Sequence, residues 1–357
     1  MDRSSKSELR KGIIFALLAS LLFGASTPLA KVLLEKVQPV LLAGLFYLGS
    51  GVGLFIWQMV SRMFKKTAQS EAALQKSDLP WLTGAIFAGG LCGPVLLMIG
   101  LSTSAASSTS LLLNLEGVFT AMLAWFVFKE NYDRRILFGM LAIAAGGVTL
   151  TFGGGTGLTF TIGSLFVVGA CFAWGADNNL TRKVSHADPL QVAMLKGLTA
   201  GTVNVLLCLL WGLRLPNLQT IAMAAFLGFW SYGVSLALFV LALRHIGAAR
   251  TGAYFSLAPF VGAALSICLL GEKVTTNFGI AAVLMGLGLW LHLTESHNHE
   301  HSHESLEHEH NHIHDEHHQH EHGPLDPPGE PHSHVHKHEE MRHSHPHFPD
   351  LHHGHPH

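Results

Sequence analysis

Ten apolar runs, each long enough to cross a lipid bilayer as a helix, constrain this 357-residue chain more than any other feature. A hydrocarbon core of roughly 30 Å needs about 20 apolar helical residues. Backbone groups in lipid must be satisfied within the protein, and long runs without alternation favour helices over barrel strands. We therefore expect an all-α membrane protein with ten transmembrane helices, at residues 12–34, 39–61, 79–101, 103–128, 134–152, 159–182, 189–213, 218–243, 247–270 and 275–293.

The composition argues against a soluble enzyme. Hydrophobic residues make up 49% of the chain and charged residues 13%, whereas soluble domains carry about 25% charged residues. The sequence contains no phosphate-cradling glycine loop, no nucleophile elbow and no H-E-x-x-H helix, so we expect no enzymatic activity and no required cofactor. The four cysteines form no C-x-x-C pair, which argues against a disulfide framework or a cysteine zinc site.

Basic residues are distributed unevenly between the expected loops. If the N-terminal segment 1–11 is cytoplasmic, 14 Lys and Arg residues fall on that side, and four fall on the other: Lys31, Lys36, Arg214 and Lys273. Loops rich in Lys and Arg remain in the cytoplasm. We therefore expect a multi-pass protein of the plasma (inner) membrane with both termini in the cytoplasm.

The apolar region repeats itself. A shift of 142 residues superimposes Glu130 on Glu272, and a shift of about 150 brings Phe-Gly-Ala at 23–25 near Trp-Gly-Ala at 174–176. An odd number of spans in each copy inverts the second relative to the first. This is the plan of secondary transporters, in which the solute site lies near the membrane midplane between the copies. We divide the body into two five-helix units, 12–152 and 159–293, joined by a loop at 153–158.

Two stretches resemble a known family. Residues 105–130 read AASSTSLLLNLEGVFTAMLAWFVFKE, and residues 242–272 read ALRHIGAARTGAYFSLAPFVGAALSICLLGE. They resemble the two copies of the EamA repeat of the drug/metabolite transporter superfamily, and the resemblance covers essentially all of residues 12–293. It implies a ten-helix bundle that moves amino acids, sugars, nucleobases or drugs by proton-coupled transport, exchange or facilitated export. Gly117 departs from the family pattern, because relatives often have there the proline that the second repeat keeps as Pro259.

Four ionisable side chains lie inside the expected spans: Glu116, Asp177, Lys196 and Arg250. Placing such a group in a membrane costs roughly 2.5–3.5 kcal/mol or more, so each is a functional candidate. Asp177 and Lys196 lie at a similar depth and are expected to pair, either in the solute pathway or only to fix the sixth helix to the seventh. Arg250 lies three residues into its span, where it can extend to the membrane surface as an anchor.

Glu116 lies near the middle of its span, with Asn114 two residues before it and Thr120 four residues after it. A carboxylate at that depth is a candidate for proton coupling or solute contact; the alternative is a structural carboxylate that a neighbouring hydroxyl binds. Glu130 and Glu272, which close the fourth and ninth helices, are instead expected to cap loops or bond between helices. The expected polar residues of the pathway are Glu116, Asn114, Asp177, Asn178 and Lys196.

Helix-breaking and aromatic residues complete the expected pathway. Proline and glycine mark segments that can bend around a site and act as gates; the alternative is helix packing through small residues. The expected gates are Ser26, Thr27 and Pro28 in the first helix, Gly175 in the sixth and Pro259 in the ninth. Four aromatic side chains that combine an apolar face with one polar atom can wall an organic solute: Tyr47, Trp174, Tyr232 and Tyr254.

Residues 294–357 form a tail of different chemistry. It holds 23 of the 26 histidines and 13 of the 24 acidic residues, and its scarcity of apolar side chains predicts disorder. Its H-x-H spacing places imidazoles on one side of an extended chain beside carboxylates, which favours zinc, nickel, cobalt or copper. The alternatives are a pH-sensitive solubilising tail or a low-complexity run with no task. The expected ligands are His297, His299, His301, His303, His308, His310, His312, His314, His332, His334, His336 and His338.

The sequence therefore predicts a permease that moves a small organic metabolite or drug by alternating access and carries a metal-binding tail. The alternative is a transition-metal (Ni, Co or Zn) transporter, or a membrane-tethered metal sensor or buffer. Against that alternative, the expected spans hold no histidine at mid-depth: His186 and His245 fall in expected loops, and His292 falls at the end of the last span. The expected partners are an organic solute, the lipid bilayer and a divalent metal at the tail, with no nucleic acid.

Overall fold

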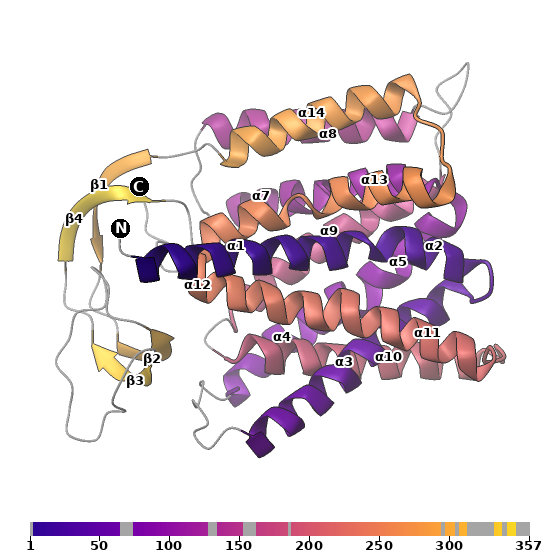
Figure 1. Cartoon of the computed structure of the whole chain (residues 1–357), viewed down its shortest axis with the longest axis horizontal. Coiled ribbons are helices and arrows are strands. Elements are labelled where there is room, and N and C mark those ends of the chain that lie inside the picture. Colours follow the sequence, from indigo (N-terminus) through magenta and orange to yellow (C-terminus); the bar gives the residue numbers. More distant parts are fainter. Residues whose placement is uncertain are drawn as a thin grey trace.

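The computed structural model describes residues 3–64, 74–127, 134–152, 162–184 and 187–293, and four segments of the tail. The described body is helical, and its helices lie roughly parallel in one bundle (Figure 1). They are α1 (Arg3–Gly24), α2 (Ser26–Leu34), α3 (Pro39–Phe64), the 3-10 helix η1 (Lys76–Asp78), α4 (Leu79–Ala85), the π-helix η2 (Ile86–Cys92), α5 (Gly93–Thr103), α6 (Ala106–Leu112), α7 (Leu115–Phe126), α8 (Arg134–Phe152), α9 (Ile162–Arg182), α10 (Pro189–Leu210), α11 (Leu218–Gly228), the π-helix η3 (Phe229–Val234), α12 (Ser235–Phe255), α13 (Ala258–Leu270) and α14 (Thr276–Leu293).

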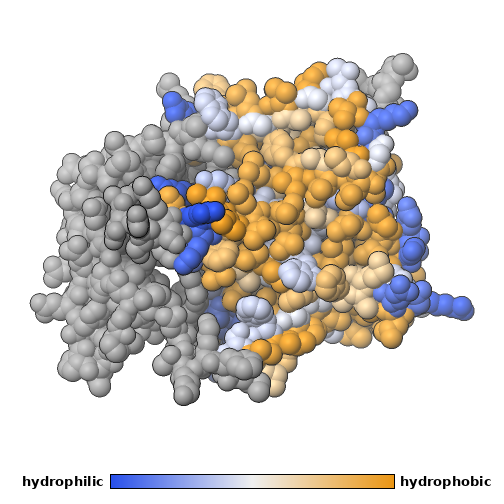
Figure 2. All heavy atoms as spheres, viewed as in Figure 1, coloured by the Kyte–Doolittle hydropathy of each residue, from blue (hydrophilic) through white to orange (hydrophobic). Residues whose placement is uncertain are grey.

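The bundle has the surface of a membrane protein. Figure 2 shows apolar residues covering its side and hydrophilic residues gathered towards its ends. Leu210, Leu218 and Val283 are 81%, 80% and 72% exposed, which suits contact with lipid. Six helical stretches of the described residues are long and apolar enough to cross a bilayer: Leu9–Leu34, Pro39–Ser61, Lys76–Thr103, Ala106–Phe126, Pro189–Leu210 and Leu218–Leu243. The chain is a multi-pass membrane protein.

The same departures from a regular α-helix occur in both halves. The π-helices η2 and η3 begin at Ile86 and Phe229, which are 143 residues apart. A two-residue turn separates α6 from α7 at residues 113–114, and another separates α12 from α13 at residues 256–257, again 143 residues later. Because single-turn π-helices are rare, this agreement identifies the two halves as copies of one unit.

The helix α12 folds back on itself. It is hydrogen-bonded as one helix from Ser235 to Phe255, but the rings of Phe239 and Phe255 have their centroids 4.9 Å apart. On a straight helix these residues would be about 24 Å apart along the axis. The chain therefore reverses between them, as the expected boundary between the eighth and ninth spans requires.

The two halves exchange their first helices. α1, from the first half, packs on α12 and α13 of the second half, and α9, from the second half, packs on α5 and α7 of the first. α3 packs on α10, and α8 packs on α14 at one edge of the bundle (Figure 1). Residues of α9 and α10 are thereby placed against residues of the first half.

Four segments of the tail are extended and pair with one another. β1 (His297–His303) pairs with β4 (Met341–His347), and β2 (Glu307–His312) pairs with β3 (His332–Lys337), both antiparallel. The alternation of histidine with other residues has the two-residue period of a strand, which explains the extended backbone. His314 and His338 lie outside the described residues.

Candidate functional site

A buried ion pair joins α9 to α10. The Nζ atom of Lys196 lies 2.5 Å from Oδ1 and 2.7 Å from Oδ2 of Asp177, and the two side chains are 15% and 9% exposed. The hydroxyl of Thr181, one turn after Asp177, donates to Oδ1 over 2.9 Å and accepts from Lys196 over 3.2 Å. The expected pairing is confirmed, and the opposite charges of the two side chains compensate each other.

Glu116 is held by an amide from the other half. It lies in the first turn of α7, where the Nδ2 atom of Asn178 on α9 donates to Oε1 over 2.9 Å. The same Nδ2 lies 3.1 Å from Oγ1 of Thr120, whose hydroxyl donates to the backbone carbonyl of Glu116 over 2.8 Å. In the expected alternative, a neighbouring hydroxyl binds the carboxylate of Glu116. The structure differs, because the carboxylate accepts from the amide of Asn178, and the hydroxyl of Thr120 donates to the backbone carbonyl of Glu116.

The carbonyl of Gly89, inside the π-helix η2, connects η2 to two other helices. It accepts a hydrogen bond of 2.8 Å from the Tyr47 hydroxyl of α3 and one of 3.0 Å from Nε1 of Trp174 on α9. A Cβ atom at position 89 would collide with the carboxylate of Asp177. Glycine is therefore required at this position, and Tyr47, Trp174 and Asp177 converge on it.

Tyr232 of η3 extends this wall towards α2. Its ring lies 5.6 Å from the ring of Tyr47 and 5.6 Å from that of Phe23, and its hydroxyl shares a hydrogen bond with Ser26. Ser26 is buried, as are its neighbours Thr27 and Pro28. The structure thus brings Tyr47, Trp174 and Tyr232 together as expected.

Two expected residues make other contacts. The amide of Asn114, in the turn between α6 and α7, donates to the carbonyl of Leu111 over 2.9 Å, and this carbonyl also accepts from the backbone N–H of Asn114. Tyr254 packs against the small cluster around Ala16, whereas Tyr232 packs against a different cluster. Arg250, expected as an anchor at the membrane surface, is exposed on α12.

The expected helix breaks are found in two places out of three. α1 ends at Gly24 and α2 begins at Ser26, and Pro259 follows the turn that begins α13. α9, however, runs unbroken through Gly175. A Cβ atom there would lie 2.9 Å from both Cβ of Phe119 and N of Thr120, so this glycine allows α7 to approach α9 closely and does not break the helix.

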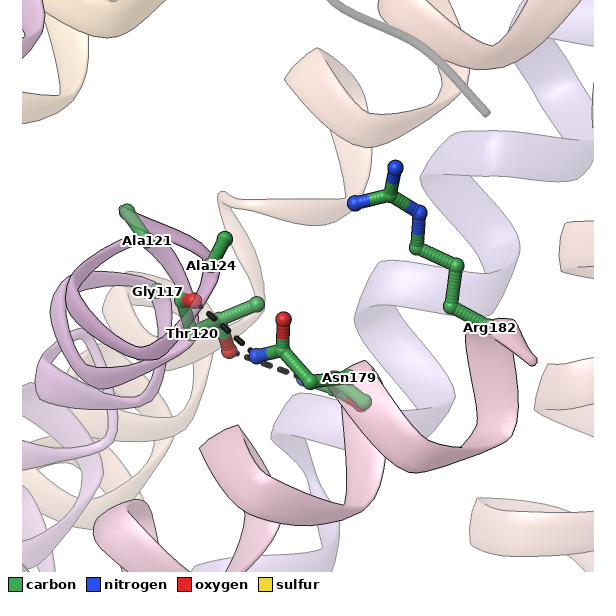
Figure 3. Close-up of a pocket in the computed structure, with 7 residues that line it drawn as sticks. Gly117, Thr120, Ala121, Ala124, Asn179 and Arg182 are labelled. Carbon is green, nitrogen blue, oxygen red and sulfur yellow. Dashed lines mark hydrogen bonds between the residues drawn. The ribbon is translucent and has the colours of Figure 1, made fainter. Parts of the chain in front are cut away.

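A pocket of about 380 Å³ lies between α7 and α9. Figure 3 shows Arg182 on the opposite side of the pocket from Ala121 and Ala124, with Asn179 bonded to Thr120 in the wall. A Cβ atom at Gly117 would meet nothing within 4 Å, so the glycine found in place of the usual proline enlarges the opening. The lining residues are Gly117, Thr120, Ala121, Ala124, Asn178, Asn179 and Arg182.

Three residues of this region were missed by reasoning from the sequence: Gly89, Thr181 and Arg182. Thr181 follows Asp177 by four residues, the spacing of neighbours on a helix face, and could have been found from that signal. Arg182 is the last residue of the expected span 159–182, and in the sequence it is only one of the 14 basic residues expected on the cytoplasmic side. Gly89 carries no signal of its own, because its role comes from a backbone carbonyl.

No group of three or more His, Cys, Asp or Glu side chains close enough to hold a metal ion occurs among the side chains that the structure describes. In the tail, the strand register places three histidines of β1 opposite histidines of β4, and three of β2 opposite histidines of β3. The facing pairs are His297 and His347, His299 and His345, His301 and His343, His308 and His336, His310 and His334, and His312 and His332. His303 faces Met341.

Known proteins resemble the chain over the whole bundle. A profile of the EamA-like transporter family matches residues 10–152 and 161–294. An uncharacterized transporter of Methanothermobacter thermautotrophicus is 28% identical over 287 residues, which cover 77% of this chain and 83% of that protein. A protein of Salmonella typhimurium, named a probable amino-acid metabolite efflux pump, is 26% identical over 297 residues, which cover 77% of this chain and 92% of that protein.

A solved crystal structure shares the fold. It aligns with a TM-score of 0.57 over 78% of this chain and 94% of its own, at 17% sequence identity.

Proposed function

This chain belongs to the EamA-like transporter family, and from that premise we propose that it is a secondary transporter for a small organic solute, working by alternating access. The name of the Salmonella typhimurium relative makes amino acids and their metabolites the first solutes to test. The sequence carries no ATP-binding motif, so the gradient of the solute or of an ion drives transport.

The proposed topology has ten transmembrane helices in two inverted five-helix repeats. It is supported by the matching π-helices, by the matching turns and by the exchange of α1 and α9 between the halves. Rocking of one repeat against the other then exposes the site to each side in turn. The excess of Lys and Arg supports cytoplasmic termini in a plasma membrane.

The observation that carries the proposal is the pocket between α7 of the first repeat and α9 of the second. Thr120 and Asn178 line it, and Asn178 also binds Glu116. A solute in the pocket competes for the same amide, so its binding responds to the protonation of Glu116. We propose Glu116 as the coupling group, with the pair Asp177 and Lys196 beside it. Tyr47, Trp174 and Tyr232 do not line this pocket, and we propose them as the aromatic part of the pathway that continues from it.

Uptake into proteoliposomes tests this function. Full-length protein and a pH gradient, with each radiolabelled amino acid in turn, should give saturable uptake of at least one of them. Asn178→Ala should reduce the rate at least about tenfold, because the pocket loses the amide that links it to Glu116. Gln219→Ala, an exposed amide at the start of α11, is the matched control. No uptake of any amino acid, or equal rates for Asn178→Ala and the control, would contradict the proposal.

A second candidate function is the transport or sensing of a transition metal. It is favoured by the register in which the tail strands pair, β1 with β4 and β2 with β3. Facing residues of an antiparallel pair have Cβ atoms about 4.5–5.5 Å apart, and imidazole suits zinc, nickel and copper. Six facing histidine pairs thus lie along two ribbons. We propose that the tail binds such an ion through these pairs.

Zinc titration separates the two candidates. The full chain should bind more zinc than a variant with His299, His301, His343 and His345 replaced by Asn. Equal binding would remove the metal role of the β1–β4 ribbon. Uptake of zinc, without uptake of any amino acid, would replace the first candidate by the second.

A further inference from the structure

A turn of only two residues separates α5 from α6, at the end of the bundle away from the N-terminus (Figure 1). α5 ends at Thr103 and α6 begins at Ala106, so carbonyl groups without helical partners lie beside amide groups without theirs. The carbonyls carry partial negative charge and the amides partial positive charge. Such a turn attracts a cation on one side and an anion on the other.

Lys31 of α2 supplies the cation. Its Nζ atom donates to the carbonyls of Leu101, Ser102 and Ser104 over 2.7, 3.2 and 2.8 Å. Because α2, α5 and α6 all belong to the first half, Lys31 fixes the turn within its own repeat. The amide side of the turn is left to face the second half.

Glu272 supplies the anion, and it comes from the second half. Gly271, with φ of 65°, ends α13 in the left-handed conformation and turns the chain at Glu272. Oε1 accepts from the backbone N–H of Ala106 over 2.7 Å, and Oε2 accepts from that of Ser107 over 2.8 Å. The expected interhelical role of Glu272 is thereby confirmed, and the carboxylate lies close enough to Lys31 for their charges to interact.

The opposite end carries the pocket. α9 begins beside α5 near the turn, since a Cβ atom at Gly163 would lie 2.9 Å from the carbonyl oxygen of Gly100. Arg182 ends α9 19 residues later, which is about 28 Å along the helix, and it lines the pocket. The structure therefore binds the halves together at the Lys31 end and leaves a pocket between them at the Arg182 end.

We propose that Glu272 is a latch between the two halves, that Lys31 positions the turn which receives it, and that this latch breaks each time the Lys31 end opens. The inference rests on the proposed alternating access. Hydrogen bonds to a carboxylate are stronger than neutral ones, so the two bonds favour the state that is closed at this end. Neither residue needs to touch the solute.

Thiol labelling at Ser110 reports the opening. Ser110 lies on α6, one turn after the latch; it is fully buried, and a Cβ atom at Gly262 of α13 would lie 2.8 Å from its Oγ. Its hydroxyl has no hydrogen-bond partner in the structure, so Ser110→Cys is a conservative reporter of the contact between halves. Full-length protein in membrane vesicles is treated with a water-soluble maleimide, and each cysteine is followed by peptide mass spectrometry. Buried Cys171 monitors the fold.

Glu272→Gln should raise the labelling rate of Cys at position 110 about tenfold or more, the size of a typical coupling between states, while the rate at Cys171 stays unchanged. An unchanged rate at position 110 overturns the proposal. A similar rise at both positions also overturns it, because Glu272 then stabilises the fold as a whole.

A charge swap provides a second test. Lys31 binds carbonyls and Glu272 binds amides, so Lys31→Glu combined with Glu272→Lys places each charge against the wrong helix end. The double variant should label at position 110 faster than either single variant. Restoration of slow labelling would mean that only a direct ion pair matters, and would overturn the latch. The labelling needs no solute, so its failure is distinct from failure of the uptake assay.

Discussion

The proposed coupling between solute binding and the protonation of Glu116 depends on one hydrogen bond, which Asn178 donates to Glu116. Asn178 offers a single Nδ2 atom to Oε1 of Glu116 and to Oγ1 of Thr120. Its partners belong to the first half, and Asn178 belongs to the second. Any change in the charge of Glu116 therefore alters a hydrogen bond between the two halves.

Glu116→Gln tests the coupling role. The amide keeps an oxygen acceptor for Asn178 but cannot exchange a proton, so uptake driven by a pH gradient should be lost while exchange of solute between the two sides continues. Both activities are measured in the same proteoliposomes with labelled solute. Uptake by the variant that still follows the pH gradient would exclude Glu116 as the proton site.

The ion pair of Asp177 and Lys196 allows a prediction about the free energy of unfolding. Lys196→Met leaves a buried carboxylate without its cation, which should cost about 3–5 kcal/mol. Asp177→Asn with Lys196→Met removes both charges and should recover most of that loss. The midpoints of thermal unfolding in detergent measure the effect. If the double variant is as unstable as the sum of the single ones, the two side chains do not stabilise each other.

At the scale of elements, each of the two π-helices contributes a group that contacts side chains of neighbouring helices. The widened turn of η2 presents the Gly89 carbonyl to Tyr47 and Trp174. π-helices often occur at functional positions, and here η2 and η3 carry Gly89 and Tyr232 respectively. Both repeats thus contribute the same kind of element to one site.

Two glycines, Gly89 in η2 and Gly117 in α7, should respond differently to a methyl group. Gly89→Ala pushes a Cβ atom into the carboxylate of Asp177 and should lower both stability and transport. Gly117→Ala adds a Cβ atom in open space and, as alanine is the better helix former, should stabilise α7 by roughly 0.5–1 kcal/mol. Unfolding midpoints of the two variants, compared side by side, give the result. Equal loss in both would mean that the space at Gly117 is already filled in the membrane.

The helix positions and the ion pair could be predicted from the sequence, because leaving backbone groups unbonded or a charge unpaired inside the membrane costs free energy. Apolar runs must be helical in lipid, and a buried charge at the depth of Asp177 needs a partner such as Lys196. Gly175 could not be assigned correctly, since the same residue serves for breaking a helix or for close packing. The reversal of α12 follows from the expected span boundary at 243–247, but the packing of Tyr254 against the cluster around Ala16 depends on which helices surround it, and the boundary does not specify them.

At the scale of the whole molecule, six stretches of the described residues are of membrane-spanning length, and the face shown in Figure 2 is mostly apolar, with hydrophilic residues towards its ends. The proposed topology has ten spans, an even number of crossings. If it is correct, residues before the first span and after the last lie on the same side of the membrane.

Labelling of the two ends tests that topology. Cysteines at Ser4 and Ser333 should both react with an impermeant maleimide in inside-out vesicles and both be protected in right-side-out vesicles. Mass spectrometry of the labelled peptides gives the readout. Reaction of the two positions from opposite sides would exclude an even number of spans.

The contact of α3 with α10 limits how the halves can move. A Cβ atom at Gly197 would lie 2.8 Å from the Cα of Gly51, and one at Gly201 would collide with the backbone of Leu48. Backbones this close cannot slide past each other without steric overlap, although they can rotate slightly about their line of contact. Under the proposed alternating access, this glycine seam would serve as the hinge axis, and the largest displacements would fall on the helices farthest from it.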